Sequence, residues 1–140
     1  MNPSPLPIAS GSAPVRLFLV EDSQAVRELL ASNLSDIPGL EFSGYSDSEG
    51  EALLQLQQNN FDVVIFDIEL KQGNGISLLR SLKSRGTRPS FLKVIFSNNV
   101  SAAYRKVGEQ YGVRYFFDKT SDLPALRRLL EQVCRGNPPG

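Results

Sequence analysis

Short apolar runs alternate along this chain with segments whose apolar residues are spaced as on a helix, and no other feature constrains the fold as strongly. The runs that we expect to form strands are 15–20, 40–45, 63–67, 93–96 and 115–117. Three of them are almost continuously apolar, which is typical of strands buried on both faces. Strands that alternate with helices in this way predict an α/β fold, in which helices cover both faces of a parallel sheet.

Helical spacing marks the segments between the strands. The apolar residues that carry it are Val26, Leu29, Leu30 and Leu34 in the first helix, Ile76, Leu79 and Leu82 in the third, and Leu126, Leu129, Leu130 and Val133 in the last. Ser48 followed by Glu51 has the capping-box pattern and predicts the start of the second helix. The stretch 101–111 is counted as the fourth helix despite Gly108 and a poor apolar stripe.

The length and charge of the chain fit one globular domain. Its 140 residues suffice for one hydrophobic core, and 15 basic residues balance 15 acidic ones, so no excess positive charge indicates nucleic acid or membrane binding. The apolar runs are too short to cross a membrane, no secretory signal is evident, and a lone cysteine, Cys134, fits a cytoplasmic location. We expect a flexible tail over 1–14, one domain over 15–135 and a flexible end over 136–140.

Polar residues stand at the expected carboxyl ends of four strands. They are Glu21 and Asp22 after the first strand, Asp67 at the third, Ser97 at the fourth, and Asp118 and Lys119 at the fifth. In an open parallel sheet these ends share one edge, where ligands bind, so we expect these side chains to converge there. The chain has no histidine, which excludes His-based triads and most zinc sites.

Three of these acids, Glu21, Asp22 and Asp67, would repel one another at this edge unless a cation neutralised them. Oxygen ligands at an open edge favour Mg²⁺ over a closed calcium cage. A carboxylate beside Mg²⁺ and a lysine can attack a phosphoryl group and form an aspartyl phosphate, because the metal and the ammonium stabilise charge on the transferred oxygens. A serine hydroxyl such as that of Ser97 would hydrogen-bond a phosphoryl oxygen.

Four motifs at the strand ends carry a resemblance to a known family. They are LFLVEDS at the first strand, VVIFDIEL at the third, VIFSN at the fourth and FFDKT at the fifth. Together and in this order, they make residues 15–135 resemble the receiver domain of response regulators in two-component signalling (CheY-like). The resemblance implies a flavodoxin-like (βα)5 three-layer sandwich, whose five-stranded parallel sheet has the order 2-1-3-4-5.

The resemblance also implies which residues perform the phosphoryl chemistry. Asp67 would be the phosphoacceptor, and Lys119 would pair with its carboxylate and then with the phosphoryl group. Ser97 would move toward the phosphoryl group after transfer. Phe116 stands where the family places a switching aromatic residue, although a plain core position is an equally good interpretation of its apolar surroundings.

A magnesium site follows from the same resemblance. Asp22 and Asp67 would bind Mg²⁺ directly, the backbone carbonyl of Glu69 would be a further ligand, and Glu21 would act through water. From the residues alone, Glu21 and Asp22 could instead cap the first helix, and Asp67 could form a structural ion pair with Lys119.

The chain departs from the family pattern at four positions. Glu21 replaces the usual aspartate, Lys71 and Thr120 stand where proline is common, and Asn98 replaces a small residue after Ser97. We expect phosphorylation to survive these changes, with a lifetime that the sequence leaves open. The lysine adds a cation to the phosphorylation loop, or is simply a solvated charge.

The implied function is a signalling switch rather than an enzyme with a separate substrate. A histidine kinase or phosphotransfer protein would supply the phosphoryl group, and a target protein or a second copy would bind the face made by the fourth helix, fifth strand and last helix. No direct nucleic acid or membrane binding is expected, and Arg127 and Arg128 are expected on the exposed side of the last helix. The open alternatives are a receiver-like module that is never phosphorylated and an aspartate-nucleophile phosphatase.

Overall fold

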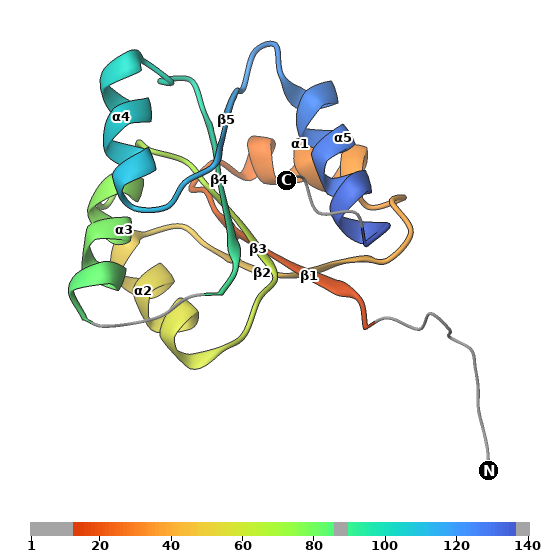
Figure 1. The fold of residues 1–140 in the computed structure, drawn as a ribbon, viewed down its shortest axis with the longest axis horizontal. Helices are drawn as coiled ribbons and strands as arrows, with labels where there is room; N and C mark the ends of the chain where they lie inside the picture. The colour runs from red at the N-terminus through yellow and green to blue at the C-terminus, as the bar shows by residue number, and fades with distance from the viewer. Residues whose placement is uncertain (1–12, 86–89, 137–140) are drawn as a thin grey trace.

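A computed structural model describes residues 13–85 and 90–136 as five strands and five helices in strict alternation (Figure 1). The strands are β1 (Val15–Val20), β2 (Leu40–Ser46), β3 (Val63–Phe66), β4 (Leu92–Ser97) and β5 (Tyr115–Asp118). The helices are α1 (Gln24–Leu34), α2 (Glu49–Gln58), α3 (Gly75–Ser84), α4 (Ala102–Gln110) and α5 (Leu123–Cys134). Of the expected tails, residues 1–12 and 137–140 lie outside the described residues.

The strands form one parallel sheet of order β2-β1-β3-β4-β5, which confirms both the fold class and the implied strand order. Helices α1 and α5 cover one face of this sheet, and α2, α3 and α4 cover the other (Figure 1). Within the described part of the chain, no helix is both long and apolar enough to cross a membrane.

Two apolar clusters, one on each face, hold the three layers together. All four residues of β3 are buried, as are the last four of β1, because alternate side chains of these central strands enter opposite clusters. Phe18 and Phe66 belong to the cluster under α2 and α3, whereas Leu17 and Ile65 belong to the cluster under α1 and α5. The near-continuous apolar runs therefore mark strands buried on both faces, as predicted.

Side-chain caps fix where four of the helices begin. The side chains of Ser23, Ser48, Asn74 and Ser101 accept backbone N–H groups at the starts of α1, α2, α3 and α4. The cap of α1 is Ser23, so the alternative in which Glu21 and Asp22 cap this helix is wrong. The cap of α1 directly follows Glu21 and Asp22, whereas residues 68–73 lie between Asp67 and the cap of α3.

Two details of the helix predictions differ in the structure. Leu29 is 43% exposed although it was placed on the apolar face of α1, because it lies about 100° around the helix from Leu30. At α2, Glu51 donates its backbone N–H to the Ser48 hydroxyl at 3.4 Å, but its side chain is exposed. The neighbouring Glu49 makes the side-chain contacts at this helix start instead.

The fourth helix forms despite Gly108, and the packing explains the glycine. Gly108 is buried against the ring of Phe116 on β5, and a Cβ at this position would lie 2.8 Å from the Phe116 Cε2 atom. Only a residue without a side chain lets α4 approach β5 this closely. Phe116 is 9% exposed and belongs to the core cluster, with the Arg105 guanidinium 5.3 Å from its ring centre.

Candidate functional site

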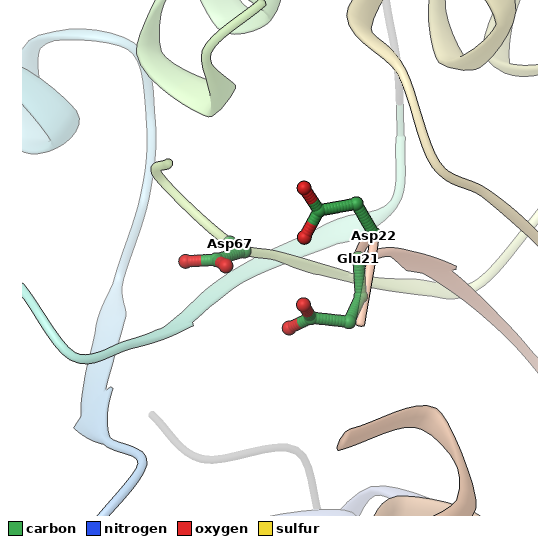
Figure 2. Close-up of side chains that lie close together, drawn as sticks. All are labelled: Glu21, Asp22 and Asp67. Carbon is green, nitrogen blue, oxygen red and sulfur yellow. The ribbon is translucent and has the colours of Figure 1, made fainter. Parts of the chain in front are cut away.

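Three of the four acids predicted at the strand ends meet at the carboxyl edge of the sheet, whereas the carboxylate of Asp118 accepts the backbone N–H and the hydroxyl of Thr120. Glu21 and Asp22 follow β1, and Asp67 follows β3, the strand that pairs with β1. Each offers one oxygen, and these oxygens all lie within 4.8 Å of one another (Figure 2). Glu21 and Asp67 are buried, whereas Asp22 is partly exposed, so the cluster opens to solvent on the Asp22 side.

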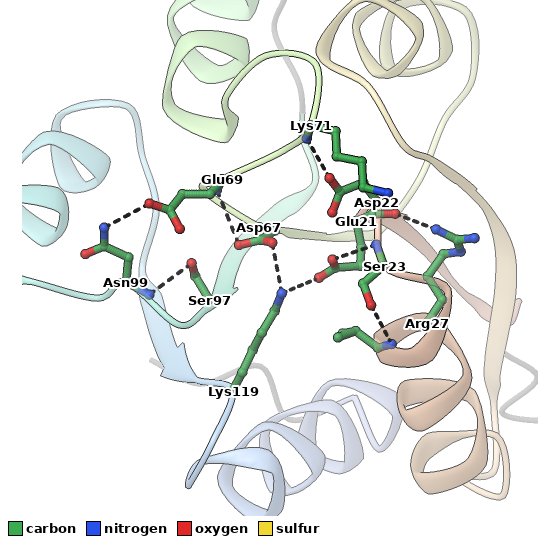
Figure 3. Close-up of polar contacts among 11 residues, drawn as sticks. Glu21, Asp22, Ser23, Arg27, Asp67, Glu69, Lys71, Ser97, Asn99 and Lys119 are labelled. Carbon is green, nitrogen blue, oxygen red and sulfur yellow. Dashed lines mark hydrogen bonds and ion pairs between the residues drawn. The ribbon is translucent and has the colours of Figure 1, made fainter.

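Lys119 is the cation of this cluster. Its Nζ atom lies 2.8 Å from Asp67 Oδ2 and 2.8 Å from Glu21 Oε1 (Figure 3). The residue directly follows β5, and its backbone N–H donates to the carbonyl of Ser97 at 3.1 Å, which fixes the origin of the long side chain. One ammonium group therefore bridges two buried carboxylates from different strands.

Burial and ion pairing shift the pKa values of Glu21 and Lys119 in opposite directions. Burial raises the pKa of Glu21, and its hydrogen bond to Lys119 offsets this only in part. For Lys119 burial is the largest single effect and lowers the pKa, but its hydrogen bonds to Asp67 and Glu21 outweigh burial, so the pKa is raised. Lys119 is therefore an ammonium throughout the physiological pH range.

The backbone of the loop after β3 hydrogen-bonds to two carboxylates of the cluster. The backbone N–H of Lys71 donates to Asp22 Oδ2, and that of Glu69 donates to Asp67 Oδ1 at 3.4 Å (Figure 3). The Lys71 side chain is exposed, so this residue contacts the site through its backbone. Gly75, the first residue of α3, packs so closely that a Cβ there would lie 2.2 Å from the Asp67 carbonyl oxygen.

Ser97 lies at the end of β4 and is 1% exposed. Its hydroxyl accepts the backbone N–H of Asn99 at 3.2 Å, and the Asn99 side chain donates to Glu69 Oε2 at 3.4 Å. These contacts connect the loop after β4 to the loop after β3 (Figure 3). Asn98, the bulky residue of the sequence prediction, is exposed.

The donor set fits a hard divalent cation. Glu21, Asp22 and Asp67 offer only carboxylate oxygens, and the single ammonium of Lys119 balances one of three negative charges. Charge and ligand type therefore both fit a hard divalent cation such as Mg²⁺. The expected ligand role of the Glu69 carbonyl stays a prediction.

Sequence reasoning missed two residues that support this edge. Arg27 on α1 donates from Nη1 to the carbonyl of Glu21 at 2.9 Å, and its guanidinium lies 4.0 Å from the centre of the exposed Tyr45 ring. Glu49 on α2 accepts a hydrogen bond from the Asn74 N–H at the end of the loop after β3 and another from the Ser77 hydroxyl in the first turn of α3. Neither has a signal in the sequence, because the positions of the groups that both residues bind depend on loop paths that the residue pattern does not specify.

Comparison with known proteins identifies a family whose pattern spans the residues of this site. The family pattern of the response regulator receiver domain matches residues 17–131. Response regulator MprA from Mycobacterium sp. (strain KMS) is 31% identical over 130 residues, which are 90% of this chain and 53% of that protein. A protein-glutamate methylesterase/protein-glutamine glutaminase from Anaeromyxobacter dehalogenans is 34% identical over 80 residues, 57% of this chain and 22% of that protein.

Solved structures share the fold. A two-component response regulator of the LuxR family from Aurantimonas sp. SI85-9A1 superposes with a TM-score of 0.76 at 23% identity, covering 90% of this chain and 89% of that chain. The curated relatives are longer proteins, since this chain spans between 22% and 53% of the two described above. Their similarity therefore concerns the domain that they share with this chain.

Proposed function

Because this chain belongs to the response regulator receiver family, we propose that it accepts a phosphoryl group on Asp67 and passes the signal on through a protein-binding surface. One observation carries the proposal. The ammonium of Lys119 bridges Asp67 and Glu21, and the carboxylate of Asp22 completes a cluster with oxygens within 4.8 Å. This combination of acceptor, cation and metal-ligating acids is what phosphoryl transfer to a carboxylate requires.

The transfer is a displacement at phosphorus. An oxygen of the Asp67 carboxylate forms the new P–O bond, the P–N bond of a phosphohistidine donor breaks, and the electron pair of that bond goes to the histidine nitrogen. Lys119 stays within reach of both the carboxylate and the transferred group, because its Nζ already contacts Asp67 Oδ2. Ser97 accepts the Asn99 N–H through its hydroxyl oxygen, and its hydroxyl hydrogen would be donated to a phosphoryl oxygen.

Magnesium would be held by Asp22, Asp67 and the Glu69 carbonyl, with Glu21 acting through water. Bound Mg²⁺ would supply positive charge to the phosphoryl oxygens. The protein itself orients the three carboxylates: the Lys71 N–H binds Asp22, and the Lys119 ammonium binds Glu21 and Asp67. Because Glu21 and Asp67 are buried, bulk water has little access to their carboxylates.

We assign the chain a signalling role rather than catalysis on a separate substrate. The phosphoryl donor would be a histidine kinase or a phosphotransfer protein. The output would pass through the face of α4, β5 and α5 to a target protein or a second copy, without direct contact to nucleic acid. Phe116 would relay the change, since its ring packs against Gly108 of α4.

The first test is phosphorylation by a small donor. The protein is incubated with phosphoramidate or acetyl phosphate and Mg²⁺, and its intact mass is recorded. We expect a gain of one phosphoryl group that is lost in Asp67→Asn and on chelation of Mg²⁺. The matched control is Asp47→Asn, an exposed aspartate on the loop after β2, which is expected to be phosphorylated like the wild type.

The other outcomes separate the alternatives. A folded wild type that gains no mass with either donor contradicts the proposal and favours a receiver-like module that acts without phosphorylation. Steady turnover of a phosphomonoester, abolished by Asp67→Asn, would instead indicate an aspartate-nucleophile phosphatase.

A further inference from the structure

The loop after β3 is held by a second carboxylate, that of Glu49, the first residue of α2. Glu49 Oε1 accepts the backbone N–H of Asn74 at 3.0 Å, and Oε2 accepts the hydroxyl of Ser77 at 2.8 Å. Its own backbone N–H donates to the carbonyl of Gln72 at 3.0 Å. One residue of α2 therefore binds both the end of this loop and the first turn of α3.

The loop also packs directly on the Glu49 side chain. Gly73 has a φ of +103°, a conformation that glycine adopts without strain. A Cβ on Gly73 would lie 2.3 Å from the Glu49 Cβ and 2.7 Å from Oε1. The absence of a side chain at this position lets the loop rest on Glu49, so the hydrogen bonds and the packing act at the same place.

The segment held in this way includes the backbone of the proposed metal site. Glu69 lies between Asp67 and Asn74, and Glu69 and Asn74 form a short antiparallel bridge. The loop is thus fixed on one side by Asp22, which accepts the Lys71 N–H, and on the other by Glu49. The contacts of Glu49 do not use the carboxylates of the cluster, so they can be removed without touching a metal ligand.

We propose that Glu49 is a positioning residue that holds the loop after β3 in the conformation that binds Mg²⁺. The inference rests on the proposed function, because it concerns the same metal-dependent site. It has a reciprocal consequence. If the Glu49 contacts stabilise the loop conformation that binds metal, metal binding stabilises those contacts by the same free energy. The effect of metal binding then extends to the first turn of α2.

The test compares Glu49→Ala with Glu49→Gln, and Glu51→Ala is the matched control. The glutamine keeps both contacts, since its amide oxygen can accept from Asn74 and its amide nitrogen can donate to the Ser77 oxygen. The control removes an exposed carboxylate from the same helix turn. The Mg²⁺ dissociation constant is measured by calorimetry without a phosphodonor, and exchange of the Asn74 amide hydrogen is measured by NMR without metal.

We expect Glu49→Ala to weaken Mg²⁺ binding roughly tenfold and to speed Asn74 exchange by a similar factor, because it removes the hydrogen bonds to Asn74 and Ser77 together. Glu49→Gln and Glu51→Ala should stay within about twofold of the wild type in both measurements. If Glu49→Ala does not fold, Ser77→Ala replaces it, with an expected weakening of about threefold from one lost contact.

Unchanged affinity and exchange in the folded Glu49→Ala protein would overturn the inference. So would an equal loss in Glu49→Gln, because charge and not hydrogen bonding would then be the cause. A wild type that binds no Mg²⁺ contradicts the proposed function. The Asn74 exchange comparison, made without metal, still decides whether Glu49 holds the loop.

Discussion

Lys119 is the single residue on which the buried charges of the site depend most directly. Its ammonium is 2.8 Å from both Asp67 and Glu21, and the three side chains are 12%, 7% and 4% exposed. Without it, two buried carboxylates face each other with no counter-ion. A group in this position affects stability as well as chemistry, because an unpaired buried charge is costly.

We therefore predict that Lys119→Met lowers the free energy of unfolding by about 3 kcal/mol without metal, and that saturating Mg²⁺ restores most of the loss. Urea unfolding with and without Mg²⁺ measures both values. Lys71→Met is the control, since the exposed Lys71 side chain is removed while its backbone contact to Asp22 remains. A loss of the same size with and without Mg²⁺ would contradict this account.

The residues of the cluster were predictable from sequence, whereas their supports were not. Asp22 and Asp67 follow buried strands, and parallel strands end at one edge, so their meeting requires only the fold. The bonds from Arg27 to the Glu21 carbonyl and from Glu49 to the Asn74 amide depend on loop geometry. A residue pattern specifies the elements and leaves such loop contacts open.

At the scale of elements, α4 shows that a poor helix former can be essential to a helix–strand contact. Gly108 lowers the helix propensity of α4, and for that reason the sequence signal there was weak. The structure requires it, because a Cβ would approach the Phe116 ring to 2.8 Å. Packing thus outweighs propensity in this helix.

We predict that Gly108→Ala lowers the free energy of unfolding by about 1 kcal/mol, because the cost of overpacking exceeds the gain of about 1 kcal/mol in helix propensity. Gly50→Ala on α2 is the matched control. Apart from its chain neighbours and the nearby backbone of α2 itself, no described atom lies within 4 Å of a Cβ placed there, so this variant should be stabilised by about 0.5 kcal/mol. Chemical denaturation measures both, and a stabilised Gly108→Ala protein would show that the Phe116 ring moves without cost.

The helical spacing predicted correctly which residues lie at the centre of the buried face of a helix. It was wrong for a residue at the edge of that face. Leu30 and Leu34 are buried as expected, but Leu29 is exposed because α1 contacts the sheet over a limited arc. At α2 the capping serine was identified correctly, yet the glutamate that makes contacts is Glu49 and not Glu51. Periodicity describes a helix by itself, and these details depend on what surrounds it.

At the scale of the whole molecule, Arg127 on α5 binds residues at the C-terminal end of α1. Its guanidinium pairs with Asp36 at 2.7 Å and with Glu131 at 3.1 Å, and it also donates to the carbonyl of Asn33. The sequence predicted an exposed arginine at this position. The structure places it between two segments about ninety residues apart, a relation that follows from the sheet order rather than from local spacing.

This contact makes stability depend on pH. The hydrogen bond to Arg127 holds the pKa of Asp36 below its ordinary value of 3.8, so the carboxylate binds protons less readily in the folded state. Its contribution is fully present above about pH 4 and is lost as the pH falls through the lowered pKa. We predict that Asp36→Asn is less stable than the wild type at pH 7, and that the difference shrinks as the pH falls below about 4 and disappears below the lowered pKa of Asp36.

Urea unfolding of both proteins across this range checks the prediction. In an Arg127→Met background the same substitution should have little effect at any pH, since the partner is gone. A difference between the Asp36 variants that persists unchanged at low pH would assign the effect to something other than the ion pair.

Strand order is a second feature of the whole molecule that the residue pattern alone did not provide. Alternation predicted a parallel sheet with helices on both faces, but the order β2-β1-β3-β4-β5 came from family resemblance and was then confirmed by the strand pairing. Many orders are compatible with the same alternation. The order matters because it sets β1 beside β3, and thereby Glu21 and Asp22 beside Asp67.

The close approach of Gly75 to Asp67 has a consequence for how this domain can vary. The atom that a mutation would add at position 75 has no room, because it would lie 2.2 Å from the carbonyl oxygen of the acceptor residue itself. Every side chain there would have to displace the acceptor or unseat the third helix. In a library of all single substitutions selected for signalling, position 75 should therefore be as intolerant as position 67, although it contributes no functional group.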